Sequence, residues 1–261
     1  ALLTGDEIVI GQAITSQLIR DLPEYLAEMG AQACNPRWNT WSYARLAELQ
    51  LSQGEHETGL QSAERAGEID SGLALTHTVR GFAYLTEIDI PQALSAFESA
   101  IALDQAAPLP RLGLGLAQIR KGQLEAGRES IEIAVALDPG NSLIRSYMGK
   151  AYYEEKRDRL AGKQYEMAKT LDPKDPTPWF YDAILKQTEN RPIEALHDMQ
   201  TSIALNDNRA VFRSRLQLDQ DLATRSASQA RIYSDLGFAQ LALRKGWEAV
   251  NAAPSNYSAH R

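Results

Sequence analysis

A 34-residue period runs through the middle of the chain and limits the folds open to it more than any other feature. Leu137–Pro139 and Leu171–Pro173 both read Leu-Asp-Pro and lie 34 residues apart. Steps of the same length reach Ile69, Leu103 and Leu205, each followed by Asp or Asn. A fixed period of this size is typical of arrays in which every unit packs on its neighbours. We therefore predict a repeat array rather than one or two globular domains.

Small residues recur in register within five units that start at residues 40, 74, 108, 142 and 176. The eighth place holds Ala47, Gly81, Gly115, Gly149 and Ala183; the twentieth holds Gly59, Ala93, Gly127, Ala161 and Ala195; the twenty-seventh holds Ala66, Ala100, Ala134, Ala168 and Ser202. The twenty-fourth place, between these columns, holds Ala63, Phe97, Ile131, Tyr165 and Met199. Because small side chains let helices approach closely, we expect these columns to lie where helices pack.

Each unit is predicted to form two amphipathic helices joined by a short turn. Apolar residues follow helical spacing at Leu94, Phe97 and Ile101. Pro173 cannot continue a helix and marks a stop, whereas Asp175 followed by Pro176 is a good start signal.

Helix pairs at this period resemble the tetratricopeptide repeat. The unit 142–175 carries the family's pattern of small and aromatic residues: Gly149, Tyr152, Ala161, Tyr165, Ala168 and Pro173. The resemblance implies an all-α fold, a right-handed superhelical solenoid of antiparallel helix pairs.

The predicted organisation has six units and one insertion. Five units run over 40–73, 74–107, 108–141, 142–175 and 176–209, followed by an insertion at 210–222 and a sixth unit at 223–256. Residues 1–39 are expected to be a helical segment with a degenerate or partial repeat, and 257–261 to open a truncated seventh unit. These ragged ends suggest a piece of a longer array.

Composition argues against several classes of partner. Lys and Arg number 27 against 34 Asp and Glu, so the formal net charge is −7. A nucleic-acid or anionic-membrane surface needs clustered positive charge. A charge-free run such as Ile8–Ile19 falls short of the roughly 20 residues that span a bilayer. We expect neither nucleic-acid binding nor direct membrane insertion.

No catalytic, cofactor-binding or metal site is predicted. His56, His77, His197 and His260 fall in different units, and Cys34 is the only cysteine. The Gly113–Gly115 stretch resembles a phosphate-loop fragment, but the repeat register already accounts for Gly115. Charged residues are interpreted as solvated helix faces. In the insertion, Asp219 and Asp221 allow three interpretations: a weak cation site, an irregular turn, or a protrusion that contacts a partner.

Binding of a protein segment is the favoured function. The resemblance implies that places 2, 5, 9, 12 and 13 of each first helix line a concave groove. The candidate groove residues are Phe82, Leu85, Leu109, Leu112, Leu116, Ile119, Lys150, Tyr153, Phe180 and Ile184. Their mainly apolar character favours an amphipathic helix or an extended apolar stretch as the ligand. The alternative is that several of them pack between helices and never meet solvent.

The chain is accordingly predicted to be a non-catalytic protein–protein interaction scaffold. The alternative is a regulatory or substrate-recruiting arm of a larger enzyme or envelope assembly, and self-association through the array ends is a further option. The family's carboxylate clamp is absent, since its places hold Ala44, Glu48, Thr78 and Phe82. Arg213–Arg261 also resembles the repeat region of bacterial envelope proteins with a FecR-like domain, which implies a bacterial source and a periplasmic or envelope-associated setting.

Overall fold

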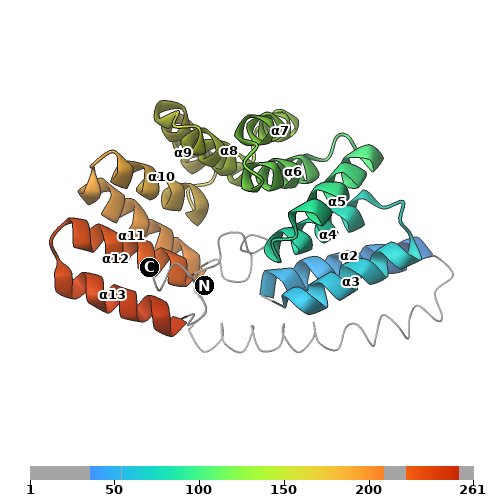
Figure 1. Ribbon diagram of the computed structural model, residues 1–261, viewed down its shortest axis with the longest axis horizontal. Coiled ribbons are helices and arrows are strands. Elements are labelled where there is room, and N and C mark those ends of the chain that lie inside the picture. Colours follow the sequence, from blue (N-terminus) through green and yellow to red (C-terminus); the bar gives the residue numbers. More distant parts are fainter. Residues whose placement is uncertain (1–35, 54, 209–221, 253–261) are drawn as a thin grey trace, which may run out of the picture. The chain divides into compact units, whose positions relative to one another are not determined.

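All secondary structure in the described part of the chain is α-helical. The computed structural model describes residues 36–53, 55–208 and 222–252, which form twelve helices and no strand (Figure 1). This confirms the predicted all-α helical repeat array. The N-terminal segment up to residue 35, most of the insertion and the start of the seventh unit lie outside the described residues.

The described helices divide into two compact parts, α2–α6 and α7–α13. The N-terminal part contains α2 (Pro36–Gln53), α3 (His56–Ile69), α4 (Ala74–Thr86), α5 (Ile90–Leu103) and α6 (Pro108–Arg120). The C-terminal part contains α7 (Leu124–Leu137), α8 (Ser142–Glu154), α9 (Asp158–Leu171), α10 (Pro176–Thr188), α11 (Pro192–Asn208), α12 (Leu222–Asp235) and α13 (Ala239–Ala252). Within each part, every helix packs against the helix that follows it.

Helix starts repeat with the sequence period. Helices α4, α6, α8 and α10 begin at Ala74, Pro108, Ser142 and Pro176, the residues at which units were expected to start. The carboxylate of Asp175 caps α10 by accepting a hydrogen bond of 2.9 Å from the Thr177 amide. Helix α2 differs, because it begins at Pro36 rather than at residue 40.

The turns between paired helices share one backbone feature. Five residues at the fifteenth place of successive units have a positive φ: Ile88, Gly122, Lys156, Asn190 and Gly237. The first four are spaced by 34 residues, whereas Gly237 follows Asn190 after 47. Glycine and asparagine adopt this conformation readily, but a β-branched residue such as Ile88 is strained there.

The core is built on the columns of small residues. All fifteen residues at the eighth, twentieth and twenty-seventh places are buried, and so are all five at the twenty-fourth place. Phe97 shows why some of these places need glycine. A Cβ atom on Gly81 of α4 would lie 2.6 Å from Phe97 Cε1, and one on Gly113 of α6 would meet the same ring edge. The Phe97 ring therefore fills a space that exists only because two neighbouring helices carry glycine.

Candidate partner-binding surface and buried charge cluster

The first helices of the N-terminal part lie side by side and present a row of apolar side chains. Helix α4 packs against both α2 and α6. Trp41, Leu75 and Leu109 occupy the second place of three successive units, one on each helix. Trp41 is 45% exposed, and Leu75 and Leu109 are half-buried. We call these three residues the apolar row.

Most of the other predicted groove residues in this part are buried. Phe82 and Leu112 are fully buried, Leu85 is nearly so, and Leu116 keeps 9% of its surface exposed. Phe82 packs edge-on against Phe97 of α5 with ring centroids 4.9 Å apart. The burial of these four side chains agrees with the alternative interpretation, in which they pack between helices. The other two candidates in this part, Leu109 and Ile119, are half-buried and keep some accessible surface.

The four candidates in the C-terminal part have different surroundings. Phe180 is buried, with the Arg225 guanidinium 4.8 Å from its ring centroid. Ile184 is half-buried and packs against a cluster that includes Met199. Lys150 forms an ion pair with Glu154 at 3.0 Å, and Tyr153 lies half-buried beneath Lys156. The groove formed by these ten residues stays a prediction.

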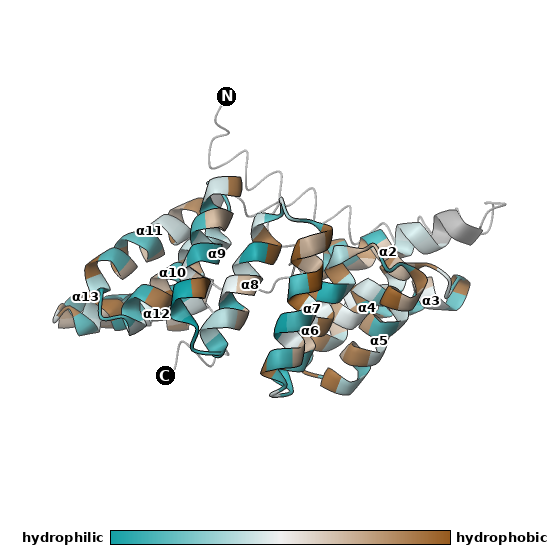
Figure 2. Ribbon diagram, turned by 90° about the horizontal axis from the view of Figure 1, so that it is seen from above, coloured by the Kyte–Doolittle hydropathy of each residue, from teal (hydrophilic) through white to brown (hydrophobic). Residues whose placement is uncertain are grey.

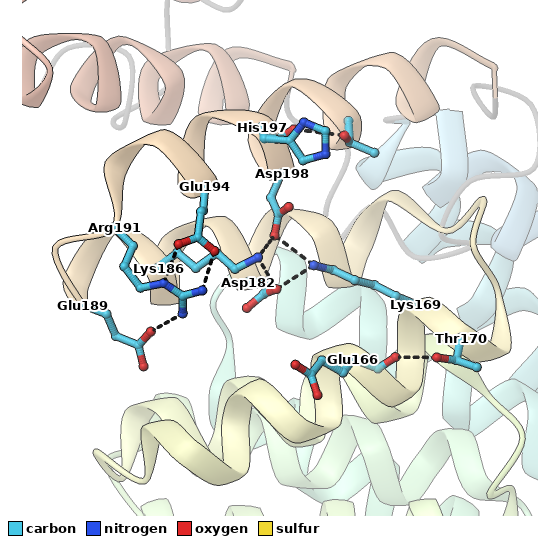
Figure 3. A network of polar contacts seen from close by, with 11 residues as sticks. Glu166, Lys169, Thr170, Asp182, Lys186, Glu189, Arg191, Glu194, His197 and Asp198 are labelled. Carbon is cyan, nitrogen blue, oxygen red and sulfur yellow. Dashed lines mark hydrogen bonds and ion pairs between the residues drawn. The ribbon is translucent and has the colours of Figure 1, made fainter.

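A buried cluster of four charges joins three helices of the C-terminal part (Figure 3). Lys169 of α9 and Lys186 of α10 each contact the carboxylates of Asp182 in α10 and Asp198 in α11. The four nitrogen–oxygen distances lie between 2.5 and 3.0 Å. Asp198 is the most deeply placed, with 3% of its side chain exposed. The Lys169 ammonium also lies 4.1 Å from the ring centroid of Trp179.

Hydrogen bonds and ion pairs within the cluster favour the charged forms of Asp198 and Lys186. Burial raises the pKa of the Asp198 carboxyl, but hydrogen bonds from Lys169 and Lys186 outweigh it and hold that pKa below its usual value. Burial lowers the pKa of Lys186, and its hydrogen bond to Asp198 and the charge of Asp182 outweigh that effect and raise the pKa. A general acid or base needs a pKa near neutrality. The pKa of Asp198 is instead lowered and that of Lys186 raised, so both move away from neutrality. The cluster therefore has the properties of a structural ion-pair network.

The charge cluster was missed in the sequence, where charged residues were interpreted as solvated. Asp182 and Lys186 are four residues apart, a spacing that also describes an ordinary exposed pair on a helix. The repeat register contained a partial signal, because Lys186 is the one charged residue at the eleventh place, which holds Gln or Tyr in the other five units. A charge at a place that is otherwise neutral indicates a residue with a specific partner.

The remaining candidate ligands and nucleophiles do not come together. His56 and His197 are exposed, and His77 is half-buried with a ring nitrogen 2.8 Å from the Ser71 carbonyl oxygen. Within the described ranges, no three His, Cys, Asp or Glu side chains are placed to hold a metal ion. Gly113 and Gly115 lie inside α6, so their stretch is helix and not a phosphate loop. Cys34, His260, Asp219 and Asp221 lie outside the described residues.

None of the described helices combines the length and apolar character needed to cross a bilayer. Residues 83–142 and 112–176 match the tetratricopeptide repeat model, which confirms such repeats in this stretch of the chain. No curated protein sequence matches the chain significantly.

Solved structures with similar folds include three helical-repeat proteins. The Cut9–Hcn1 hetero-tetramer of the APC/C matches with a TM-score of 0.68 and 15% identity over 95% of this chain, which spans 44% of that chain. PilW, a type IV pilus biogenesis factor, matches at 0.62 and 16% over 85% of this chain and 96% of its own. The tetratricopeptide repeat protein TTC0263 of Thermus thermophilus matches at 0.62 and 17%, over 76% and 98%.

Identities this low show the fold alone. The tetratricopeptide repeats imply a protein–protein interaction scaffold, and proteins with such repeats are generally non-catalytic. The resemblance of Arg213–Arg261 to FecR-domain envelope proteins, and with it a bacterial source, stays a prediction.

Proposed function

We propose that the chain is a non-catalytic scaffold that binds an apolar segment of a partner protein along the first helices α2, α4 and α6. The tetratricopeptide repeats support a protein-binding role. The observation that carries the location is the apolar row, in which Trp41, Leu75 and Leu109 repeat one register place on neighbouring helices and keep accessible surface.

The character of the row suggests what it binds. Contiguous exposed apolar side chains often mark interaction sites. An amphipathic helix or an extended apolar stretch can place one anchor residue against each member of such a row. The Arg45 guanidinium lies 5.3 Å from the Trp41 ring centroid and forms an ion pair with the Glu48 carboxylate, which balances its charge. We therefore expect the preferred segment to be recognised mainly by its apolar anchors.

Selection from a phage-displayed peptide library, followed by fluorescence anisotropy on the selected peptides, tests this proposal. The informative variant is Trp41→Ala combined with Leu109→Ala, which removes two members of the row without adding charge. We expect it to weaken peptide binding by at least about tenfold, or about 1.4 kcal/mol.

A matched control variant lies on a second helix of the same part. Leu103 in α5 is 47% exposed and lies outside the row, so Leu103→Ala should leave peptide affinity unchanged. Far-UV circular dichroism checks that both variants keep their helices. Equal affinity of the row variant and the unmodified chain would exclude the apolar row as the site, and equal loss in both variants would indicate a general effect of stability. A recruiting arm of a larger enzyme would use the same surface.

A further inference from the structure

The charge cluster lies across the contact between the fourth and fifth repeat units and is divided unequally between them. Lys169 of α9 comes from the fourth unit, whereas Asp182, Lys186 and Asp198 come from α10 and α11 of the fifth (Figure 3). The fifth unit therefore brings one negative charge in excess, and the fourth unit brings the positive charge that balances it. Figure 2 shows hydrophilic residues interspersed with hydrophobic ones along α9 and α10.

The fifth unit alone builds the surroundings of the Lys169 ammonium. Its Nζ lies 2.5 Å from Oδ2 of Asp182, 2.8 Å from Oδ2 of Asp198 and 4.1 Å from the ring centroid of Trp179. We call Asp182, Asp198 and Trp179 the lysine socket. A buried ion pair adds little net stability, but removing one partner leaves an uncompensated buried charge and is costly. The socket therefore favours a cation over an apolar side chain.

The repeat register shows that this contact is a general one with an unusual occupant. A Cβ atom added to Gly67, at the twenty-eighth place of the first unit, would lie 3.4 Å from Nη1 of Arg80, at the seventh place of the second. Lys169 and Asp182 occupy the same two places of the fourth and fifth units. In the other five units the twenty-eighth place holds a small or apolar residue: Gly67, Ile101, Val135, Ile203 and Val250. The fourth unit alone supplies a cation there.

We infer that the lysine socket fixes the stacking order of the array, by making the fourth unit the one neighbour in this chain that the fifth unit accepts. Similar units can pack on a wrong neighbour during folding, which is a characteristic failure of repeat proteins. If α10 packed on α7 instead of α9, Val135 would stand where Lys169 stands. The excess negative charge of the fifth unit would then be buried beneath an apolar side chain. The cost of that charge excludes an arrangement that the shared columns of small residues would otherwise allow.

Lys169→Val tests this in the full chain, because it places under the socket the residue type that α7 would offer. We expect it to raise the equilibrium constant of unfolding at least about tenfold in guanidinium denaturation. Adding Asp182→Met, the residue type of Met148 at the same place of the fourth unit, removes the excess charge and leaves Lys186 paired with Asp198 at 2.6 Å. This neutral double variant should be more stable than Lys169→Val alone.

Lys163→Val is the matched control, since it removes the same charge from an exposed position of α9. It should change the equilibrium constant of unfolding by no more than about threefold, the effect of helix propensity. A Lys169→Val variant as stable as the neutral double variant overturns the inference, because the socket would then accept an apolar neighbour.

A second measurement reports the stacking order itself rather than stability. Spin labels at Glu125 of α7 and Ile193 of α11, with 84% and 75% exposed, occupy the eighteenth place of the third and fifth units. Pulsed electron paramagnetic resonance after refolding, with Cys34→Ser as background, should give one distance with the natural charges. The neutral double variant should add a population at a shorter distance, because a misstacked α11 lies one unit closer to α7. A single, unchanged distance in the neutral double variant overturns the inference.

Discussion

Replacing Gly81 by alanine tests whether close helix approach is rigidly built into the repeats. Gly81 lies inside α4, and an added Cβ would lie 2.6 Å from Cε1 and 2.7 Å from Cδ1 of Phe97. The ring cannot move aside, because Phe97 is fully buried, Phe82 packs against it edge-on, and Gly113 of α6 lies against the same ring edge. The added methyl group must therefore push α4 away from α5.

Two effects of opposite sign decide how much Gly81→Ala changes the free energy of unfolding. Alanine is favoured over glycine in a helix interior by about 1 kcal/mol. Overpacking a tight core costs about 1–3 kcal/mol, and a contact about 1 Å too short against a ring held on several sides belongs in the upper half of that range. We therefore expect Gly81→Ala to lower the free energy of unfolding by about 1–2 kcal/mol net.

Guanidinium denaturation followed by circular dichroism measures this change, with the slope of the transition compared between variants. The control is Gly67→Ala in α3 of the same part, where an added Cβ would come no closer than 3.4 Å to a neighbouring atom. That variant should gain up to about 1 kcal/mol from helix propensity. A Gly81→Ala variant as stable as the Gly67→Ala variant would show that α4 and α5 can move apart at Phe97 without loss of stability, and it would refute the reasoning.

Three further outcomes follow from the charge cluster and from the strained turn. Asp198→Asn leaves Lys169 and Lys186 buried with one carboxylate between them and should cost about 3–5 kcal/mol in thermal or chemical unfolding. Because the folded-state pKa of Asp198 is lowered, its contribution is fully present above the ordinary aspartate pKa and is lost as pH falls through the folded value. The melting temperature of the unmodified chain should thus fall more steeply than that of Asp198→Asn as the pH drops from about 6 to about 3. Ile88→Asn relieves a φ of 65° at an exposed position and should stabilise the chain by about 1 kcal/mol; an unchanged melting temperature would contradict this.

Much of the helical architecture could be predicted because it depends on local and periodic features. Pro176 and Asp175 mark a helix start by their own chemistry, and α10 begins there. A residue that is small in every unit, such as Gly81 or Ala183, occupies a place where each unit meets a neighbour, and these places are buried. Periodicity thus carries tertiary information, because the same contact is repeated along the chain.

The candidate site was less accessible to sequence reasoning. Phe82 and Leu112 occupy places that the resemblance assigns to a groove, yet both are fully buried. The repeat register predicts which face of a helix a residue occupies to within one or two positions. Whether a large side chain on the border of that face turns outward or packs inward depends on the neighbouring helix, as the Phe97 ring shows for Phe82.

By itself the sequence determined the period, the helix pairs, the small-residue seams and the net negative charge, since each depends on residue type and spacing alone. Only the tertiary structure decided which apolar side chains stay accessible and which charges are buried. Lys169, Asp182, Lys186 and Asp198 come from three helices, and their ion pairs form because packing brings those helices within hydrogen-bond distance. Spacing along a helix cannot show these contacts, because the partner atoms belong to other helices.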